Sequence, residues 1–90
     1  MEERTTDVVE VDGVSIEYYP DVLKSQRFIM ALGDITDDDL PEGEKIVVTA
    51  RMMRMLFGDG RYRIVDEMER RGAVFKDWLM SFFKAVGAKN

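Results

Sequence analysis

The sequence has no cysteine, no histidine and only two prolines. Without cysteine the chain can form neither disulfides nor thiolate metal sites. Without histidine it lacks the usual general base at neutral pH and the commonest metal ligand. Its serines, Ser15, Ser25 and Ser81, therefore have no histidine to activate them as nucleophiles. We expect a protein that is not an enzyme and that has no catalytic, cofactor-binding or metal-binding residues.

Long apolar runs are also missing. No stretch approaches the ~20 apolar residues that cross a membrane, and residues 1–7 are too polar and acidic for a signal peptide. We therefore expect a cytoplasmic protein with no membrane partner. A chain of 90 residues has room for one domain, residues 1–90, with a single modest core.

Charge is divided unevenly between the two halves of the chain. Residues 1–44 contain 13 acidic and 3 basic residues, whereas residues 45–90 contain 5 acidic and 10 basic ones. An acidic half of this kind repels nucleic acid, which is therefore not the expected partner. These charges can form two solvated faces, or they can attract each other within one fold or between copies, and we expect self-association.

Residues 6–18 predict a β-hairpin. Val14, Ile16 and Tyr18 alternate with polar residues at the period of a strand. Asp12-Gly13 separates this run from an earlier valine-rich one, and the dipeptide favours a two-residue type I′ turn because both positions need positive φ. A lone hairpin is marginal in water, so its apolar face should pack on helices.

A helix and an acidic linker follow the hairpin. Residues 21–35 predict an amphipathic helix that either Asp21 or Ser25 can cap. Residues 36–43 predict a linker whose acidic residues raise the question of a calcium site. The EF-hand spacing fails, because a loop that starts at Asp34 has Asp39 in place of the glycine and Lys45 in place of the glutamate. A loop that starts at Asp37 has Pro41 at its fifth position. We expect a solvated linker that ends at a helix N-terminus.

Residues 44–57 predict the helix around which the rest of the chain is organised. At about 100° per residue, its apolar side chains cover an arc of roughly 220°, against the ~100° of an ordinary surface helix. Such a helix needs cover from two or three directions, which its own chain or a partner can provide. The seven methionines of the chain fit either a gap-filling core or a surface that repacks around varied apolar partners.

Two more helices are predicted, over residues 60–71 and 74–86. The first has a narrow apolar stripe and ends at Gly72. The second carries aromatic residues over about half its circumference, a face that can supply core alone or core plus a contact surface. The predicted fold is therefore mostly α (α+β), with an N-terminal β-hairpin packed on a compact bundle of about four short helices.

One possible function is a small helix-turn-helix regulator that binds nucleic acid. Gly58-Asp59-Gly60 joins two predicted helices, and arginines cluster around it. Against this, Asp66, Glu67 and Glu69 on the second helix would meet the phosphates of DNA. The arginines concerned are Arg51, Arg54, Arg61, Arg63, Arg70 and Arg71.

The order of elements also resembles that of the short tail assembly chaperones of long-tailed, siphovirus-type phages and prophages. The resembling stretches are a hairpin that runs into a helix, VDGVSIEYYPDVLKSQRFIMALGDI, and an apolar helix followed by an amphipathic one, MMRMLFGDGRYRIVDEMERRG. The acidic linker between them and the aromatic C-terminal helix complete the order.

This resemblance implies a non-enzymatic protein of the host cytoplasm that is absent from the mature virion. It implies binding to the tape measure protein, which such chaperones keep soluble until the tail tube polymerises, with the tail tube protein as a second partner. The resemblance and the wide apolar arcs together select five partner-facing candidates, namely Met52, Met55, Trp78, Phe82 and Phe83.

Overall fold

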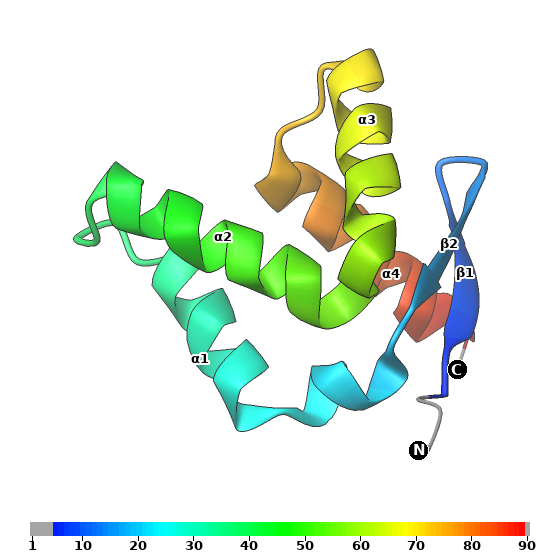
Figure 1. Ribbon diagram of the computed structural model, residues 1–90, viewed down its shortest axis with the longest axis horizontal. Helices are drawn as coiled ribbons and strands as arrows, with labels where there is room; N and C mark the ends of the chain where they lie inside the picture. Colours follow the sequence, from blue (N-terminus) through cyan, green and yellow to red (C-terminus); the bar gives the residue numbers. More distant parts are fainter. Residues whose placement is uncertain (1–4, 90) are drawn as a thin grey trace.

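The computed structural model describes residues 5–89 (Figure 1). In chain order its elements are β1 (Asp7–Val11), β2 (Val14–Tyr18), the 3-10 helix η1 (Pro20–Lys24), α1 (Gln26–Ile35), α2 (Glu42–Phe57), the 3-10 helix η2 (Gly58–Gly60), α3 (Arg61–Arg71) and α4 (Phe75–Lys89). The described chain is mostly helical, and its antiparallel hairpin packs against the helices. The predicted fold class is therefore confirmed.

The two strands of the hairpin meet at a tight turn. Asp12 and Gly13 have φ angles of 51° and 84°, the positive values that a type I′ turn requires. The register places Val11 opposite Val14 at the mouth of the turn. Asp12 is the only non-glycine residue among the described ones with positive φ, a conformation that aspartate tolerates better than most residues.

One face of the hairpin is buried and the other is exposed. Val9 and Ile16 lie opposite each other in the register and are both buried, whereas the intervening Glu10 and Glu17 are exposed. This period of two is the alternation that the sequence predicts. The buried face packs on α4 through β1 and on α2 through β2.

The single helix expected over residues 21–35 is divided into two. The 3-10 helix η1 comes first, and the backbone then becomes extended at Ser25, with φ −72° and ψ 131°. The Oγ of Ser25 accepts a hydrogen bond from the backbone N–H of Phe28 at 3.5 Å. Ser25 is therefore the N-cap of α1, and Asp21 lies instead in the first turn of η1.

The later helices differ from the expected bounds at their ends. α2 begins at Glu42 instead of residue 44, with Pro41 at its N-cap. Glu42 and Glu44 both lie in its first turn, where the helix dipole favours acids. α4 continues through Gly87 to Lys89 instead of ending at residue 86, because one glycine in a helix costs only about 1 kcal/mol.

The hairpin and the end of α2 meet at a close junction. The backbone N–H of Tyr19 donates to the carbonyl of Leu56 at 2.9 Å. Gly58, which directly follows α2, has φ 56° and ψ −132° and lies under the ring of Tyr19. This backbone conformation is accessible to glycine and strained for other residues, so Gly58 allows the chain to turn here against the tyrosine.

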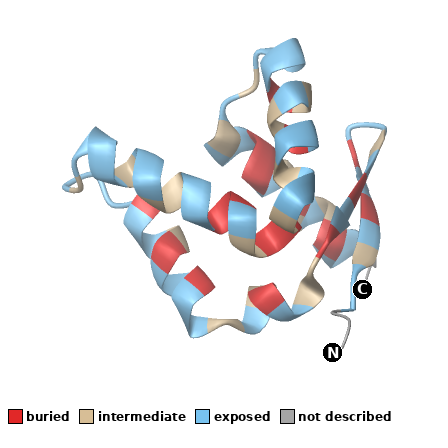
Figure 2. Cartoon of the chain, in the orientation of Figure 1, coloured by how far each residue is buried: buried red, intermediate tan, exposed pale blue. Residues whose placement is uncertain are grey.

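One apolar cluster joins the hairpin, η1 and all four α-helices of the described chain. The buried residues are Val9, Val11, Ile16, Tyr18, Val22, Phe28, Ala31, Ile35, Met52, Met53, Leu56, Phe57, Ile64, Met68, Trp78, Leu79, Phe82 and Val86. In α2 these residues come only from the second half of the helix, from Met52 onward. The core therefore lies toward the hairpin end of α2, and the first half of this helix extends beyond it (Figure 2).

Candidate functional site

The structure places the five predicted partner-facing side chains in or beside the core. Met52 and Phe82 have no exposed surface and Trp78 is 5% exposed. Met55 and Phe83 are half-buried and pack against the same cluster. Met52, Trp78 and Phe82 therefore do not form a contact surface in this conformation, and only Met55 and Phe83 keep part of their surface open.

The contacts of Phe82 show why the aromatic face of α4 packs into the core. The Phe82 ring lies 5.1 Å from that of Tyr18, 5.5 Å from that of Phe57 and 5.6 Å from that of Trp78, between ring centroids. The first two pairs are edge-to-face and the third is stacked, both favourable geometries. The hairpin and the end of α2 cover α4 from two directions, which uses most of its apolar arc for the core.

The exposed apolar surface lies elsewhere, on the first half of α2 and beside it. No residue from 42 to 51 is buried, although this stretch includes Ile46, Val47, Val48 and Ala50. The exposed fractions of Ile46 and Val47 reach 68% and 58%. The fold therefore buries the wide apolar arc of α2 only in the second half of the helix.

Residues 46–53 of α2, together with α3 and the start of α4, line a groove. Its volume is about 350 Å³. We call it the α2–α3 groove, and its lining is Ile46, Thr49, Ala50, Met53, Arg61, Tyr62, Val65, Met68 and Phe75. Met53 and Met68 are almost fully buried and form its base, whereas Tyr62 is 64% exposed at its edge.

A second hollow of about 350 Å³ begins on the other side of Ile46. It shares Ile46, Thr49 and Phe75 with the α2–α3 groove, and adds Val74, which is 63% exposed. The two hollows therefore adjoin along α2, and the lining of the second one also includes Ile35 and the charged residues Glu42, Lys45 and Lys76. Charged groups stand at its outer end, where the Nζ of Lys45 lies 3.8 Å from a carboxylate oxygen of Glu42.

Three exposed residues that line these hollows were not among the predicted partner-facing residues, namely Ile46, Tyr62 and Val74. Ile46 belongs to the wide apolar arc of α2, and that arc is the signal that could have identified it. Tyr62 lies beside the narrow stripe of α3, and Val74 precedes α4 by one residue. Their exposure depends on how the helices cross, which local periodicity does not specify.

Arg61 and Tyr62 form the polar edge of the groove. The guanidinium of Arg61 donates to the carbonyl of Gly58 and to the hydroxyl of Tyr62, each at 2.8 Å. It also lies 4.4 Å from the centroid of the Tyr62 ring, within the range of a cation–π contact. These contacts hold the exposed tyrosine in place at the end of α2.

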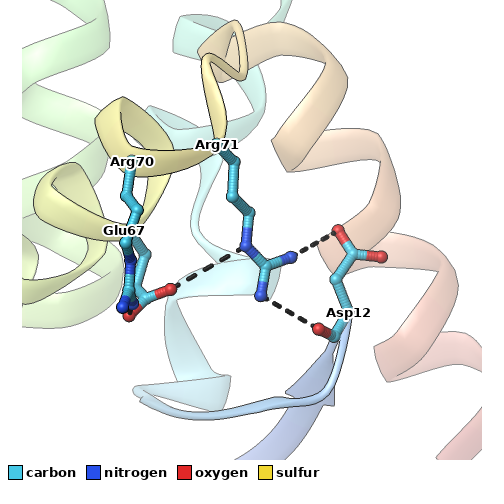
Figure 3. Close-up of polar contacts among 4 residues, drawn as sticks. All are labelled: Asp12, Glu67, Arg70 and Arg71. Carbon is cyan, nitrogen blue, oxygen red and sulfur yellow. Dashed lines mark hydrogen bonds and ion pairs between the residues drawn. The ribbon is translucent and has the colours of Figure 1, made fainter.

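Three of the six clustered arginines make contacts within the fold. Arg61 is held as described, and Arg70 pairs with Glu67. Arg71 donates to the carbonyl of Asp12 at 2.9 Å, and its guanidinium lies 3.3 Å from the Asp12 carboxylate (Figure 3). The remaining three arginines are exposed, namely Arg51, Arg54 and Arg63. Half of the cluster therefore makes contacts that stabilise the fold.

The acidic residues of the α1–α2 linker lie at the surface. Asp37, Asp38 and Asp39 are all exposed, and the Oδ1 of Asp37 accepts from the backbone N–H of Asp39 at 2.9 Å. Within the described part of the chain, no group of three metal-binding side chains comes close enough to hold an ion. None of the helices in residues 5–89 combines the length and apolar character that a membrane span requires.

Comparison of this chain with protein-family models, curated proteins and solved structures finds no match.

Proposed function

We propose that this protein is a tail assembly chaperone of a long-tailed phage or prophage, which binds the tape measure protein and keeps it soluble before the tail tube polymerises. The observation that carries this proposal is the largely apolar α2–α3 groove, with exposed Ile46 in its wall and a second hollow of mixed lining beside it. The order of elements described from the sequence connects this surface to that family of chaperones.

The dimensions of the surface suit an amphipathic helix. The exposed first half of α2, residues 42–51, is about 15 Å long at 1.5 Å per residue. An α-helix laid along it presents two or three turns of apolar residues at the i, i+3, i+4 and i+7 spacing of groove-binding helices. Tape measure proteins are long and helical, so they offer many such segments in succession.

The base of the groove suits varied sequences. Met53 and Met68 provide it, and methionine is unbranched and polarizable, so it adapts to side chains of different shape. A chaperone that covers a long protein must bind many segments weakly instead of one segment tightly. Adaptable methionines under exposed Ile46 and Tyr62 meet this requirement.

Co-expression with the tape measure protein of the same genome tests the proposal. We expect the chaperone to move the tape measure protein from the pellet to the supernatant after lysis. Ile46→Asp, which places a charge in the groove, should abolish this effect. Met80→Asp is the matched control, because Met80 is 62% exposed on α4 and does not line the groove. Equal insolubility with and without the wild-type protein would refute the proposal.

A further inference from the structure

The outer side of α2 carries a second exposed surface, which shares only Ala50 with the lining of the α2–α3 groove. We call it the α2 ridge and define it as Gly43, Val47, Ala50 and Arg54. At 100° per residue these four positions lie within an arc of about 60°, and all four are exposed. Three of them are small or apolar, so another helix can approach closely.

The two ends of the ridge have opposite charge. Glu42 and Glu44 lie in the first turn of α2, and Arg54 lies in its last turn. Arg51 is exposed one turn before that end. Among residues 5–88, neither Glu44 nor these two arginines have an ion-pair partner within the chain. The ridge is therefore an apolar strip between an unpaired acid and two unpaired bases.

We propose that the α2 ridge pairs with the α2 ridge of a second copy, in antiparallel orientation, across a two-fold axis near residues 48 and 49. The charges select this orientation, because antiparallel packing brings the acidic start of each helix to the basic end of the other. Parallel packing would oppose like charges at both ends. By symmetry every favourable pair forms twice, and the interface closes as a dimer.

The side chains suit the register that this axis defines. Val47 lies opposite Ala50 of the second copy, and Gly43 lies opposite Arg54 of the second copy. The missing side chain at Gly43 leaves space for the arginine. Glu44 and Arg51 lie on the same side of the ridge. In an antiparallel pair related by a two-fold axis, this side of one helix lies next to the same side of the other helix. Glu44 therefore faces Arg51 of the second copy.

Of the residues that line the α2–α3 groove, the ridge contains only Ala50, so pairing leaves the rest of the groove lining free. Ile46 lies on the groove side of α2, about 100° around the helix from Val47. The dimer therefore goes beyond the proposed function and does not depend on it. A dimer would present two grooves, so that one assembly could hold two segments of the same apolar partner. Such bivalent binding strengthens weak individual contacts.

Sedimentation equilibrium of the purified protein with charge-reversal variants tests the pairing. We expect the wild type to dimerise, with an affinity that falls as salt increases. Glu44→Arg and Arg51→Glu should each raise the dissociation constant about tenfold, because a reversed pair occurs twice in the interface. The double variant Glu44→Arg/Arg51→Glu should restore dimerisation. A wild-type monomer, or a double variant as weak as the single ones, would overturn the proposal.

Cysteine cross-linking tests the orientation, and the absence of native cysteine keeps the background low. Val47→Cys lies close to the axis and should form a disulfide-linked dimer under mild oxidation. Arg54→Cys should not, since the two copies of residue 54 lie about 16 Å apart along an antiparallel pair. Met80→Cys on the exposed side of α4 controls for random collision. Cross-linking of Arg54→Cys as readily as Val47→Cys, or of neither variant above the control, would contradict the antiparallel ridge.

Discussion

The guanidinium of Arg71 at the end of α3 reaches the turn of the hairpin, 59 residues away in the sequence, and donates to the carbonyl of Asp12 at 2.9 Å. The same guanidinium lies 3.3 Å from the carboxylate of Asp12 and 3.8 Å from that of Glu67. Figure 3 shows this bridge between the β1–β2 turn and α3. It ties the tip of the hairpin to the end of α3.

We expect Arg71→Ala to lower the free energy of unfolding by about 1 kcal/mol, because a charge-assisted hydrogen bond and a partly exposed ion pair are lost together. Urea denaturation measures this change. Arg70→Ala is the matched control, since Arg70 is more exposed and, among the described residues, pairs with Glu67 of the same helix. Equal effects of the two substitutions would contradict a bridging role for Arg71.

The second prediction concerns Gly58 and Tyr19. A Cβ on Gly58 would lie 3.3 Å from the Tyr19 ring, in a backbone conformation with φ 56° and ψ −132°. Gly58→Ala should therefore destabilise the protein by about 2 kcal/mol or more, from backbone strain and crowding together. Thermal unfolding followed by circular dichroism measures the effect.

Gly72 provides the control for Gly58. It has the ordinary left-handed conformation with φ 66° and ψ 25°, and a Cβ there would meet open space. Gly72→Ala should cost only about 1 kcal/mol. If both substitutions had the same effect, the contact between Gly58 and Tyr19 would have no energetic importance.

The hairpin, the elements along the chain and the overall class could be predicted from the sequence because their signals are local. Asp12-Gly13 specifies the turn, and apolar periodicity specifies the helices. The division at Ser25 was harder to predict, because Asp21 and Ser25 are both good N-caps. Only the 3-10 conformation of η1 decides between them.

The contact surface could not be predicted in the same way. Periodicity gives the width of an apolar arc, but the crossing of the helices determines which part of that arc is covered. The hairpin and η1 pack on α2, and the hairpin also packs on α4, so Met52 and Phe82 became core. The first half of α2 lies beyond this cover, which leaves Ile46 exposed.

The third prediction follows from the burial of Phe82. Its side chain has no exposed surface and touches rings from the hairpin, α2 and α4. Phe82→Ala should destabilise the protein by about 3–5 kcal/mol, the usual effect of removing a buried phenylalanine. Met80→Ala on the exposed side of the same helix should change stability by less than about 0.5 kcal/mol. A well-folded Phe82→Ala variant of near wild-type stability would show that this residue is not part of the core.

The fourth prediction concerns nucleic acid. We expect no electrophoretic shift of duplex DNA at low salt, because Arg61, Arg70 and Arg71 make contacts within the fold while the acidic linker is exposed. A basic DNA-binding domain of similar size serves as the positive control. A shift that Arg51→Ala or Arg63→Ala weakens would favour the helix-turn-helix regulator over the chaperone.

The most direct test of the account is to map the binding of an apolar helix by nuclear magnetic resonance. A synthetic amphipathic peptide copied from the tape measure protein is added to the isotope-labelled protein, and the backbone amide signals of the labelled protein are followed. We predict that the shifts concentrate at Ile46, Tyr62 and Val74 around the α2–α3 groove, and that Ile46→Asp abolishes them. Unchanged spectra, or shifts confined to the exposed face of α1 at Ile29 and Met30, would contradict the groove as the binding site.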